Sequence, residues 1–259
     1  MRIALGVEYD GTPFCGWQSQ PTRCGVQDAL ELAIANIAQQ PIRIHAAGRT
    51  DTGVHALLQI VHFDTDVIRS DNAWVRGVNA YLPSTIRVLW SKLVNDDFHA
   101  RFSATRRCYE YLLVNAPVAP AILNAKAGWY HQPLDFAAMK EATTYFLGQH
   151  DFSAFRASEC QAKSPIRTMY EASVNSYGNK VVFQFVANAF LQHQVRNMIG
   201  ALIYIGKGKY LPNHIETLLA QKNRKLSPPT FSADGLYLSG VEYDPMWGLP
   251  NQRQHINLI

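Results

Sequence analysis

The chain has 259 residues, of which 47% are hydrophobic and 17% are charged. This composition excludes a disordered chain, because burial of so much apolar surface offsets the conformational entropy lost on folding. Lys and Arg exceed Asp and Glu by 24 to 20, and this net charge of +4 points only weakly to an anionic partner. The opening residues lack the apolar core of a secretory signal, and no apolar stretch reaches the length of a membrane-spanning helix. We therefore expect a cytoplasmic protein with no membrane-bound part.

The first half of the chain alternates between strand and helix patterns. Apolar residues alternate with others over residues 3–9, which predicts a strand with one buried face. A stripe of apolar residues at helical spacing predicts a helix over residues 26–40. Further strands are expected over residues 42–47, 58–63 and 86–93, with a helix over residues 71–81 that ends before Pro83.

The second half repeats this order. A strand is expected over residues 108–115, a helix over residues 135–147, and a hairpin with arms at 168–176 and 180–188. Two helices, at 190–205 and 213–221, and a strand at 235–243 complete it. The repetition predicts an α+β fold of two similar halves, residues 1–104 and 105–259, each resembling a ferredoxin-like or RRM-like unit.

The four cysteines lie in no recognisable metal or redox pattern. Cys15, Cys24, Cys108 and Cys160 form no pair at zinc-site spacing and no CxxC motif. We expect four reduced thiols, because nothing in the opening residues directs the chain to an oxidising compartment. The cysteines therefore indicate neither a structural metal site nor a redox motif.

One segment, residues 47–56 with the sequence Ala-Gly-Arg-Thr-Asp-Thr-Gly-Val-His-Ala, combines flexible glycines with reactive groups. It lies between two predicted strands and carries Asp51 beside Arg49, with no second carboxylate nearer than Glu31 and Asp64. One interpretation is a turn capped by its own threonines, which composition alone favours. The other is a loop that presents a lone carboxylate as a nucleophile.

This segment is similar to the signature of the tRNA pseudouridine synthase A family, in which the Asp of the Gly-Arg-Thr-Asp run is the nucleophile. Five further blocks resemble that family and follow its order: YDGTPFCGWQ at 9–18, FHARFSA at 98–104, YEY at 109–111, FLQHQVRNMIG at 190–200 and ADGLYL at 233–238. Together these blocks extend over nearly the whole chain, which makes the resemblance far more specific than any single motif.

The resemblance implies a fold and a reaction. The fold is that of the pseudouridine synthases, with mixed, mostly antiparallel sheets that join around a central cleft. The reaction is the isomerisation of uridine to pseudouridine at positions 38, 39 and 40 of the anticodon stem and loop of tRNA, with Asp51 as nucleophile. The family works without cofactor or metal, as a homodimer with one tRNA reaching across both subunits.

The resemblance also assigns three residues to substrate binding. Tyr109 matches a tyrosine expected to stack on the target base, although its alternation with Tyr111 is equally typical of strand core. Arg196 lies in an apolar helical pattern, and we expect it either to pair with Asp51 and keep it ionised or to extend its head group to water. Leu236 is expected beneath the base.

A larger set matches the tRNA-contacting positions of the family. Arg49 corresponds to its base-flipping arginine, and at Lys163 and Ser164 this chain departs from the more usual Arg-Thr, which removes a bidentate phosphate contact. The expected set comprises Arg49, Arg69, Phe98, His99, Ala100, Arg101, Phe102, Gln161, Ala162, Lys163, Ser164 and Pro165. A further group of basic residues at 207–225 is either a solvated face or part of the tRNA surface.

Two other classes of protein compete with the isomerase. A noncatalytic RNA-binding protein with duplicated RRM-like sheets would be expected to carry the aromatic RNP1 pattern, which the sequence lacks. A metal-dependent hydrolase using Asp51 and His55 would require a ligand set that the sequence does not offer. Tritium release from 5-tritiated uridine in tRNA distinguishes the isomerase from both.

Overall fold

The computed structural model describes residues 1–257. The chain forms two compact units: unit 1 contains residues 1–106 together with those from Tyr237 onward, and unit 2 contains residues 107–236. The first boundary between the units falls after Arg106. The last strand is grouped with unit 1 because it pairs with a strand of that unit.

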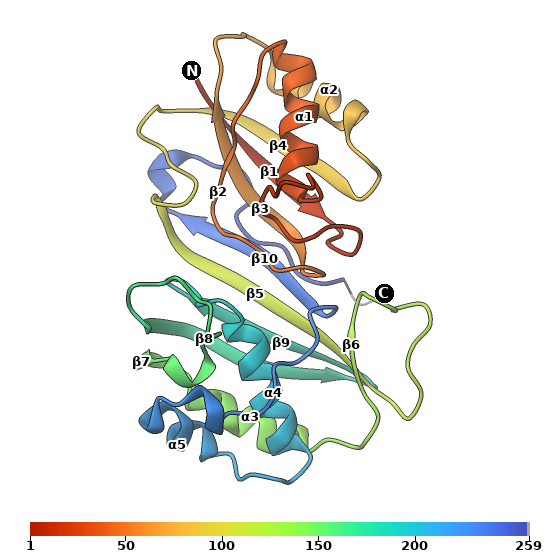
Figure 1. Cartoon of the computed structure of the whole chain (residues 1–259), viewed down its shortest axis with the longest axis vertical. Helices are drawn as coiled ribbons and strands as arrows, with labels where there is room; N and C mark the ends of the chain where they lie inside the picture. Colours follow the sequence, from red (N-terminus) through yellow and green to blue (C-terminus); the bar gives the residue numbers. More distant parts are fainter. Residues whose placement is uncertain (258–259) are drawn as a thin grey trace. The chain divides into compact units, whose positions relative to one another are not determined.

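The sheet of unit 1 is mostly antiparallel (Figure 1). β1 (Arg2–Tyr9) lies between β3 (His55–Asp64) and β4 (Ile86–Val94) and is antiparallel to both. The short β2 (His45–Ala46) pairs antiparallel with the second half of β3, and β10 (Leu236–Tyr243) runs parallel to its first residues. Up to β4 the elements follow the strand-helix-strand-strand-helix-strand order of a ferredoxin-like unit.

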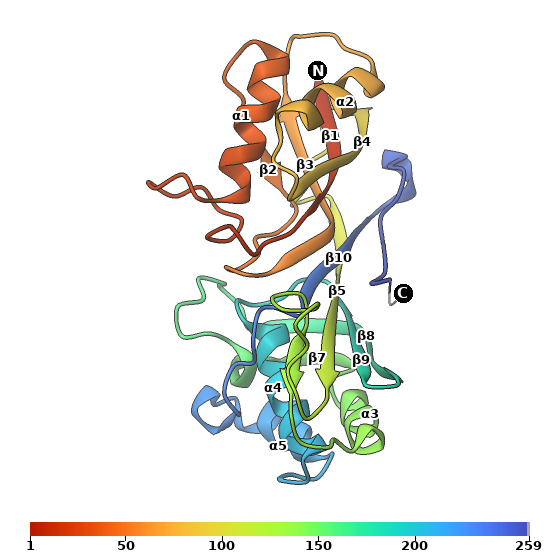
Figure 2. The same ribbon diagram turned by 90° about the vertical axis from the view of Figure 1, so that its right-hand side faces the viewer.

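Two helices of unit 1, α1 (Val26–Ala38) and α2 (Asp71–Tyr81), pack side by side (Figures 1 and 2). The start of α2 is fixed by Ser70, whose hydroxyl accepts the amide of Ala73. Its buried side chains include Trp74, which packs edge-on against a phenylalanine of β3. The predicted bounds of α2 are confirmed, and those of α1 are right to within two residues.

Unit 2 repeats the order of strand, helix, hairpin and helix. Its strands lie in the order β5 (Ala104–Asn115), β9 (Lys180–Ala187), β8 (Ile166–Tyr177) and β7 (Gly148–Asp151), and each neighbouring pair is antiparallel. β6 (Gly128–Tyr130) adds a parallel partner to β5. The expectation of an α+β fold with mostly antiparallel sheets is confirmed.

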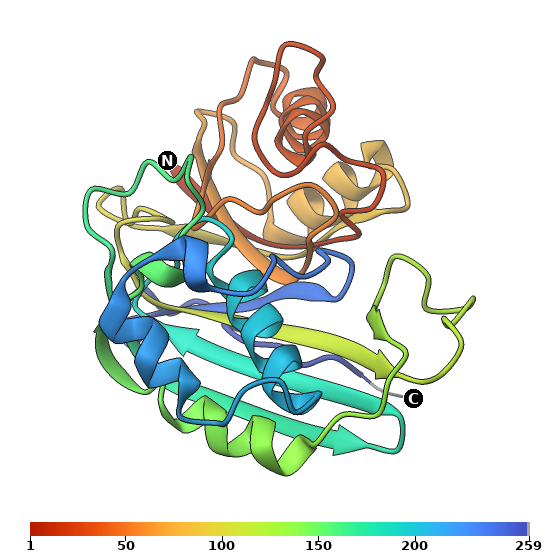
Figure 3. The same ribbon diagram turned by 60° about the horizontal axis from the view of Figure 1, so that its bottom comes forward.

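The helices of unit 2 lie on one side of its strands (Figure 3). They are α3 (Phe136–Thr144), α4 (Gln194–Gly206) and α5 (His214–Gln221). Nearly all of α4 is buried, so it is the central helix of the unit. Short 3-10 turns lie at 153–155, 224–226 and 245–247. No helix within residues 1–257 is long and apolar enough to cross a membrane.

Three expectations about the elements are wrong. The strand expected over residues 42–47 is reduced to His45–Ala46, because the residues before it pair with no strand. The helix expected from residue 190 begins only at Gln194, after His193 adopts a left-handed conformation with φ of 61°. The short strands β6 and β7 were not expected at all, since three or four residues carry too little periodicity to be recognised.

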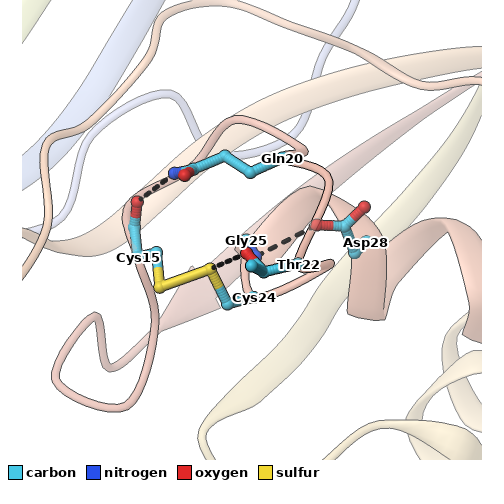
Figure 4. The surroundings of a disulfide bond; sticks show 6 residues. All are labelled: Cys15, Gln20, Thr22, Cys24, Gly25 and Asp28. Carbon is cyan, nitrogen blue, oxygen red and sulfur yellow. Dashed lines mark hydrogen bonds between the residues drawn. A yellow bond between two sulfur atoms is a disulfide. The ribbon is translucent and has the colours of Figure 1, made fainter.

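The expectation of four reduced thiols is also wrong. Cys15 and Cys24 form a disulfide, with their Cα atoms 5.4 Å apart (Figure 4). The intervening loop turns back on itself, and the amide of Cys15 donates to the carbonyl of Cys24 over 2.9 Å, so the two side chains are brought together. Cys108 and Cys160 are reduced thiols, as expected, and both are buried. A separation of nine residues is no recognised motif, so sequence offered no signal for the pairing.

Candidate active site

The loop that carries Asp51 connects β2 to β3 in unit 1. It ends in a tight turn in which the amide of Val54 donates to the carbonyl of Asp51 over 3.1 Å. Gly53 supplies the left-handed conformation that this turn requires, with φ of 79°. Asp51 is half-buried and Arg49 is exposed. The loop therefore presents one carboxylate and one cation near the surface of unit 1.

A buried hydrogen-bond network holds the backbone that leads into Asp51. The hydroxyls of Tyr9 and Thr50 are 2.8 Å apart, and the side-chain amide of Gln59 donates to the carbonyl of Gly48 over 2.8 Å. Tyr9 is 2% exposed and Gln59 is fully buried. Burial raises the pKa of Tyr9 far above its ordinary value, so its hydroxyl keeps its proton and its hydrogen bonds.

The segment after β1 packs directly on this loop. The amide of Trp17 donates to the carbonyl of Thr50 over 3.0 Å. Gly16 has φ of 90°, and a Cβ atom there would lie 2.9 Å from the oxygen of Thr50 and 3.2 Å from the carbonyl carbon of Asp51. Only glycine fits at this position, which explains physically why the block at 9–18 accompanies the Asp51 loop.

His55 holds a second turn beside the loop. It is buried, and its Nδ1 accepts the amide of Gly11 over 3.1 Å and lies 3.2 Å from a carboxylate oxygen of Asp10. Its ring stacks on that of Tyr237, with centroids 4.7 Å apart. Burial, with a smaller contribution from the charge of Asp10, raises the pKa of Tyr237. His55 thus positions the turn that follows β1. Within residues 1–257, no cluster of three or more His, Cys, Asp or Glu could hold a metal ion.

Tyr109 lies on β5 of unit 2, opposite Phe185 of β9. It is half-buried, and its ring meets that of Phe190 edge-on with centroids 5.1 Å apart. Tyr111, two residues along the strand, is fully buried and donates its hydroxyl to the carbonyl of Ser232 over 3.0 Å. The core role expected from alternation therefore applies to Tyr111, whereas Tyr109 is only half-buried.

Arg196 lies in the first turn of α4 and is half-buried. Its Nε donates to the carbonyl of Phe231 over 3.0 Å, and the amide of Phe231 donates back to the carbonyl of Arg196 over 3.2 Å. The first bond holds the guanidinium group against the Phe231 segment, and the second ties that segment to the backbone of α4. Leu236 is buried, and the amide of Leu236 closes a turn by donating to the carbonyl of Ala233 over 2.8 Å. Whether Arg196 pairs with Asp51 stays a prediction.

The expected RNA-contacting residues of unit 1 differ in the exposure of their side chains. Phe98 and Ala100 are buried, so their side chains belong to the core of the unit. Arg101 and Phe102 are exposed, and the guanidinium carbon of Arg101 lies 5.6 Å from the centre of the Phe102 ring. Arg69, before α2, is exposed as well. The accessible part of this block is therefore its second half.

In unit 2, two arginines hold the expected RNA-contacting loop at residues 161–165. Arg156 donates to the carbonyl of Cys160 and, over 2.9 Å, to that of Ala162. Arg167 donates to the carbonyl of Ser164 over 3.0 Å. Lys163 and Ser164 are exposed on the loop. The sequence did not indicate a role for either arginine, nor for Tyr9 and Gln59. Each of these side chains holds the backbone of another segment, and the sequence pattern around it does not show which segment that is.

Comparison with known proteins identifies the family. A model of the family described as tRNA pseudouridine synthase matches residues 6–103 and 142–244. The chain belongs to the tRNA pseudouridine synthase family. The expected resemblance is thereby confirmed. Asp51 and Arg196 lie within the matched ranges of this family, and Tyr109 lies in the interval between them.

Full-length relatives in the tRNA pseudouridine synthase family support this assignment. The protein named tRNA pseudouridine synthase A from Methylobacillus flagellatus is 63% identical over 258 residues, which cover 100% of this chain and 99% of the relative. Proteins of the same name from Nitrosomonas eutropha and Dechloromonas aromatica are 56% and 55% identical, covering 96% and 97% of this chain and 90% and 96% of theirs. A chain in the crystal structure of a Cbf5-Nop10-Gar1 complex is distantly similar, with a TM-score of 0.35 and 14% identity over 91% of this chain and 48% of that one.

Proposed function

We propose that this member of the tRNA pseudouridine synthase family isomerises uridine to pseudouridine in tRNA, with the carboxylate of Asp51 as the nucleophile. The observation that carries the proposal is the fixed backbone around Asp51. Bonds to the carbonyls of Gly48 and Thr50 hold the chain before it, and the turn to Val54 holds the chain after it. A nucleophile gains most from such positioning, because its approach to the reacting carbon is already set.

The reaction needs no external reagent. The bond between N1 of the base and C1′ of the ribose breaks, the base turns, and a bond between C5 and C1′ forms. C5 then loses a proton and N1 gains one, so that substrate and product are isomers. A carboxylate assists either by trapping the sugar at C1′ or by adding to the base, and both routes need it ionised.

The remaining substrate-binding roles are proposals of the same kind. Tyr109, which is half-buried, offers a ring for stacking on the target base and a hydroxyl for proton transfer. Arg196, whose Nε donates to the carbonyl of Phe231, would keep Asp51 ionised by pairing with it. Leu236 offers an apolar side chain for packing under the base.

On the RNA side, Arg49 is the proposed base-flipping residue, since it is exposed and lies two positions before Asp51. The exposed Arg69, Arg101 and Lys163 supply cations for phosphate contacts. The proposed substrate sites are positions 38, 39 and 40 in the anticodon arm, as the family resemblance implies. The proposed working form is a cytoplasmic homodimer.

Tritium release from tRNA containing 5-tritiated uridine tests the function. Wild-type protein is expected to release tritium, and Asp51→Asn, which keeps the shape but loses the charge, to reduce the rate about a thousandfold or more. Its affinity for tRNA is expected to stay within about threefold. Asp66→Asn removes an exposed carboxylate of the same unit and serves as the matched control. Equal release by Asp51→Asn would remove Asp51 from the mechanism.

The same assay decides between the isomerase and a noncatalytic RNA-binding protein. Wild-type protein that binds tRNA but releases no tritium would support the RNA-binding alternative. For Arg196, the substitution Arg196→Met is expected to lower turnover much more than tRNA affinity, since its proposed partner is the nucleophile. A loss confined to affinity would contradict the proposed pairing with Asp51.

A further inference from the structure

Unit 1 contains a group of four neighbouring aromatic rings. None of the roles described above explains why they lie together. The ring of His45 lies 5.1 Å from that of His62, stacked at 22°, and 5.4 Å from that of His99. His62 and His99 are 4.6 Å apart, and His99 lies 4.3 Å from Phe102. Three different parts of unit 1 supply these rings: β2, β3 and the loop after β4. We call His45, His62, His99 and Phe102 the ring cluster.

Hydrogen bonds fix the inner members of the ring cluster. The Nδ1 of His62 accepts the amide of Ala100 over 3.1 Å, and the Nδ1 of His99 accepts the amide of Arg101 over 3.1 Å. Burial lowers the pKa of His62 to about 3 and that of His99 below its ordinary value, so both rings are neutral near pH 7. Neutral, fixed rings are a suitable support for further stacking.

The outer members face solvent. Phe102 is 75% exposed and His45 is also exposed, whereas His62 is buried and His99 is half-buried. Large exposed aromatic rings lose favourable burial unless another molecule covers them. Arg101 lies against the Phe102 ring, so this surface also carries a positive charge. The combination of accessible ring faces and a guanidinium group is typical of single-stranded RNA-binding surfaces.

The position of His45 connects this surface to the chemistry. β2 consists only of His45 and Ala46, and the Asp51 loop starts directly after it. The amide of Ala47 donates to the carbonyl of Ile60 over 2.9 Å, which ties the start of the loop to β3. One short, fixed stretch thus carries the exposed imidazole and, six residues later, the proposed nucleophile.

From this geometry we propose that His45 belongs to the RNA-binding surface, where it and Phe102 stack on unpaired bases of the tRNA substrate with His99 as their common support. This proposal rests on the proposed function, since it names a contact for the same substrate. The basic and aromatic composition favours RNA over a protein partner as the molecule that covers the cluster. Sequence did not indicate His45, because its part in the surface depends on rings distant along the chain.

Affinity measurements with an anticodon stem-loop RNA test the proposal. The RNA carries 2-aminopurine at one unpaired loop position in turn, so that stacking is detected as quenching of its fluorescence. His45→Ala is expected to weaken binding about 5-fold to 100-fold, in line with the loss of one base-ring stack, and to reduce quenching at one or more positions. His45→Phe keeps a ring and is expected to bind within about threefold of wild type. Tyr81→Ala removes another exposed ring of unit 1, 58% accessible at the end of α2, and is expected to change nothing.

The outcomes separate this proposal from the function itself. Thermal unfolding of each variant shows whether it is folded, and Phe102→Leu gives a second test that leaves β2 intact. In one outcome, wild-type protein releases tritium while His45→Ala and Phe102→Leu both keep unchanged RNA affinity and quenching. That result would contradict the stacking role but not the proposed isomerase activity. Equal weakening by His45→Ala and His45→Phe would also overturn it, because a ring would then not be what matters. Absence of tritium release by wild type would instead contradict the proposed function.

Discussion

The hydroxyl of Tyr9 lies 2.8 Å from the hydroxyl of Thr50, the residue that immediately precedes Asp51. Both side chains are buried, so this bond links the end of β1 to the proposed nucleophile through a single intervening residue. A buried hydroxyl left without its partner costs about 1–3 kcal/mol. The bond therefore contributes both to the stability of unit 1 and to the position of Asp51.

We expect Tyr9→Phe to lower kcat for tritium release about 3-fold to 10-fold with little change in KM, because the loop loses its support while the RNA surface is untouched. Tyr243→Phe is the matched control: it removes another buried hydroxyl of unit 1, which donates to the carbonyl of Ala100 over 2.6 Å. Both variants should lose about 1–2 kcal/mol of stability. If the two lower kcat equally, Tyr9 has no particular role in positioning Asp51.

Gly16→Ala should be much more harmful than its size suggests. The left-handed backbone disfavours any side chain, and the new methyl group would press on the carbonyl of Thr50. We expect a loss of roughly 2–4 kcal/mol in the free energy of unfolding and at least a tenfold lower kcat. Gly178 has φ of 61° and lies at a turn with open space around it. Gly178→Ala should therefore lower the free energy of unfolding by only about 1–2 kcal/mol and leave the activity unchanged. Chemical denaturation and tritium release measure both effects.

His62 should make unit 1 sensitive to acid. Its pKa is lowered from 6.5 to about 3 in the folded protein by burial and by the nearby His99, Arg2 and His45, which outweigh the opposing charge of Asp64. Between these two values the unfolded chain binds a proton that the folded chain does not. The stabilising effect of the neutral ring is therefore complete above about pH 6.5 and is lost as the pH falls, by at most about 1.4 kcal/mol per pH unit.

The measurement that checks this is the free energy of unfolding from pH 7 to pH 4.5. His62→Asn keeps an acceptor for the amide of Ala100 but has no titrating group. It should be less stable than wild type at pH 7 and show a shallower decline below pH 6.5. Parallel curves for the two proteins would mean that His62 does not carry the acid sensitivity.

The disulfide should stabilise unit 1 under oxidising conditions. In the unfolded chain it closes a loop of about ten residues, for which the loop-entropy model gives about 2–3 kcal/mol. Dithiothreitol should lower the unfolding free energy of wild type by that amount and leave a Cys15→Ser, Cys24→Ser double variant unchanged. Cys108→Ser, which removes a thiol outside the disulfide, should keep the response to dithiothreitol. An identical response by the double variant would assign the effect to another source.

The helices and strands were predicted well where nearby residues, such as a capping residue or a proline, determine their bounds. α2 was predicted from its start to its end, because Ser70 caps it and Pro83 follows closely. β1 was predicted to within a residue from alternation, and β4 and both arms of the β8–β9 hairpin were predicted to within a few residues. The strand expected over residues 42–47 failed because pairing, which no local pattern encodes, is limited to His45 and Ala46.

The same distinction between local signals and distant contacts applies to the candidate site. Asp51 could be singled out because a charged and hydroxyl-rich run between glycines is unusual in sequence. The groups that hold it could not, since Tyr9 and Gln59 read as ordinary strand residues and act through contacts with distant parts of the chain. The disulfide and the contacts of His45 and His62 with the ring of His99 could not be predicted for the same reason.

The pairing of β10 with β3 has a consequence for how the protein is made. Tyr237 lies opposite His55, so unit 1 is assembled from both ends of the chain with the whole of unit 2 inserted between them. On the ribosome, the Asp51 loop is synthesised early, but the strand that completes its sheet emerges only after residue 236. Nascent chains shorter than this contain the proposed nucleophile, Asp51, in an unfinished sheet, so the sheet of unit 1 is completed only when β10 has been synthesised.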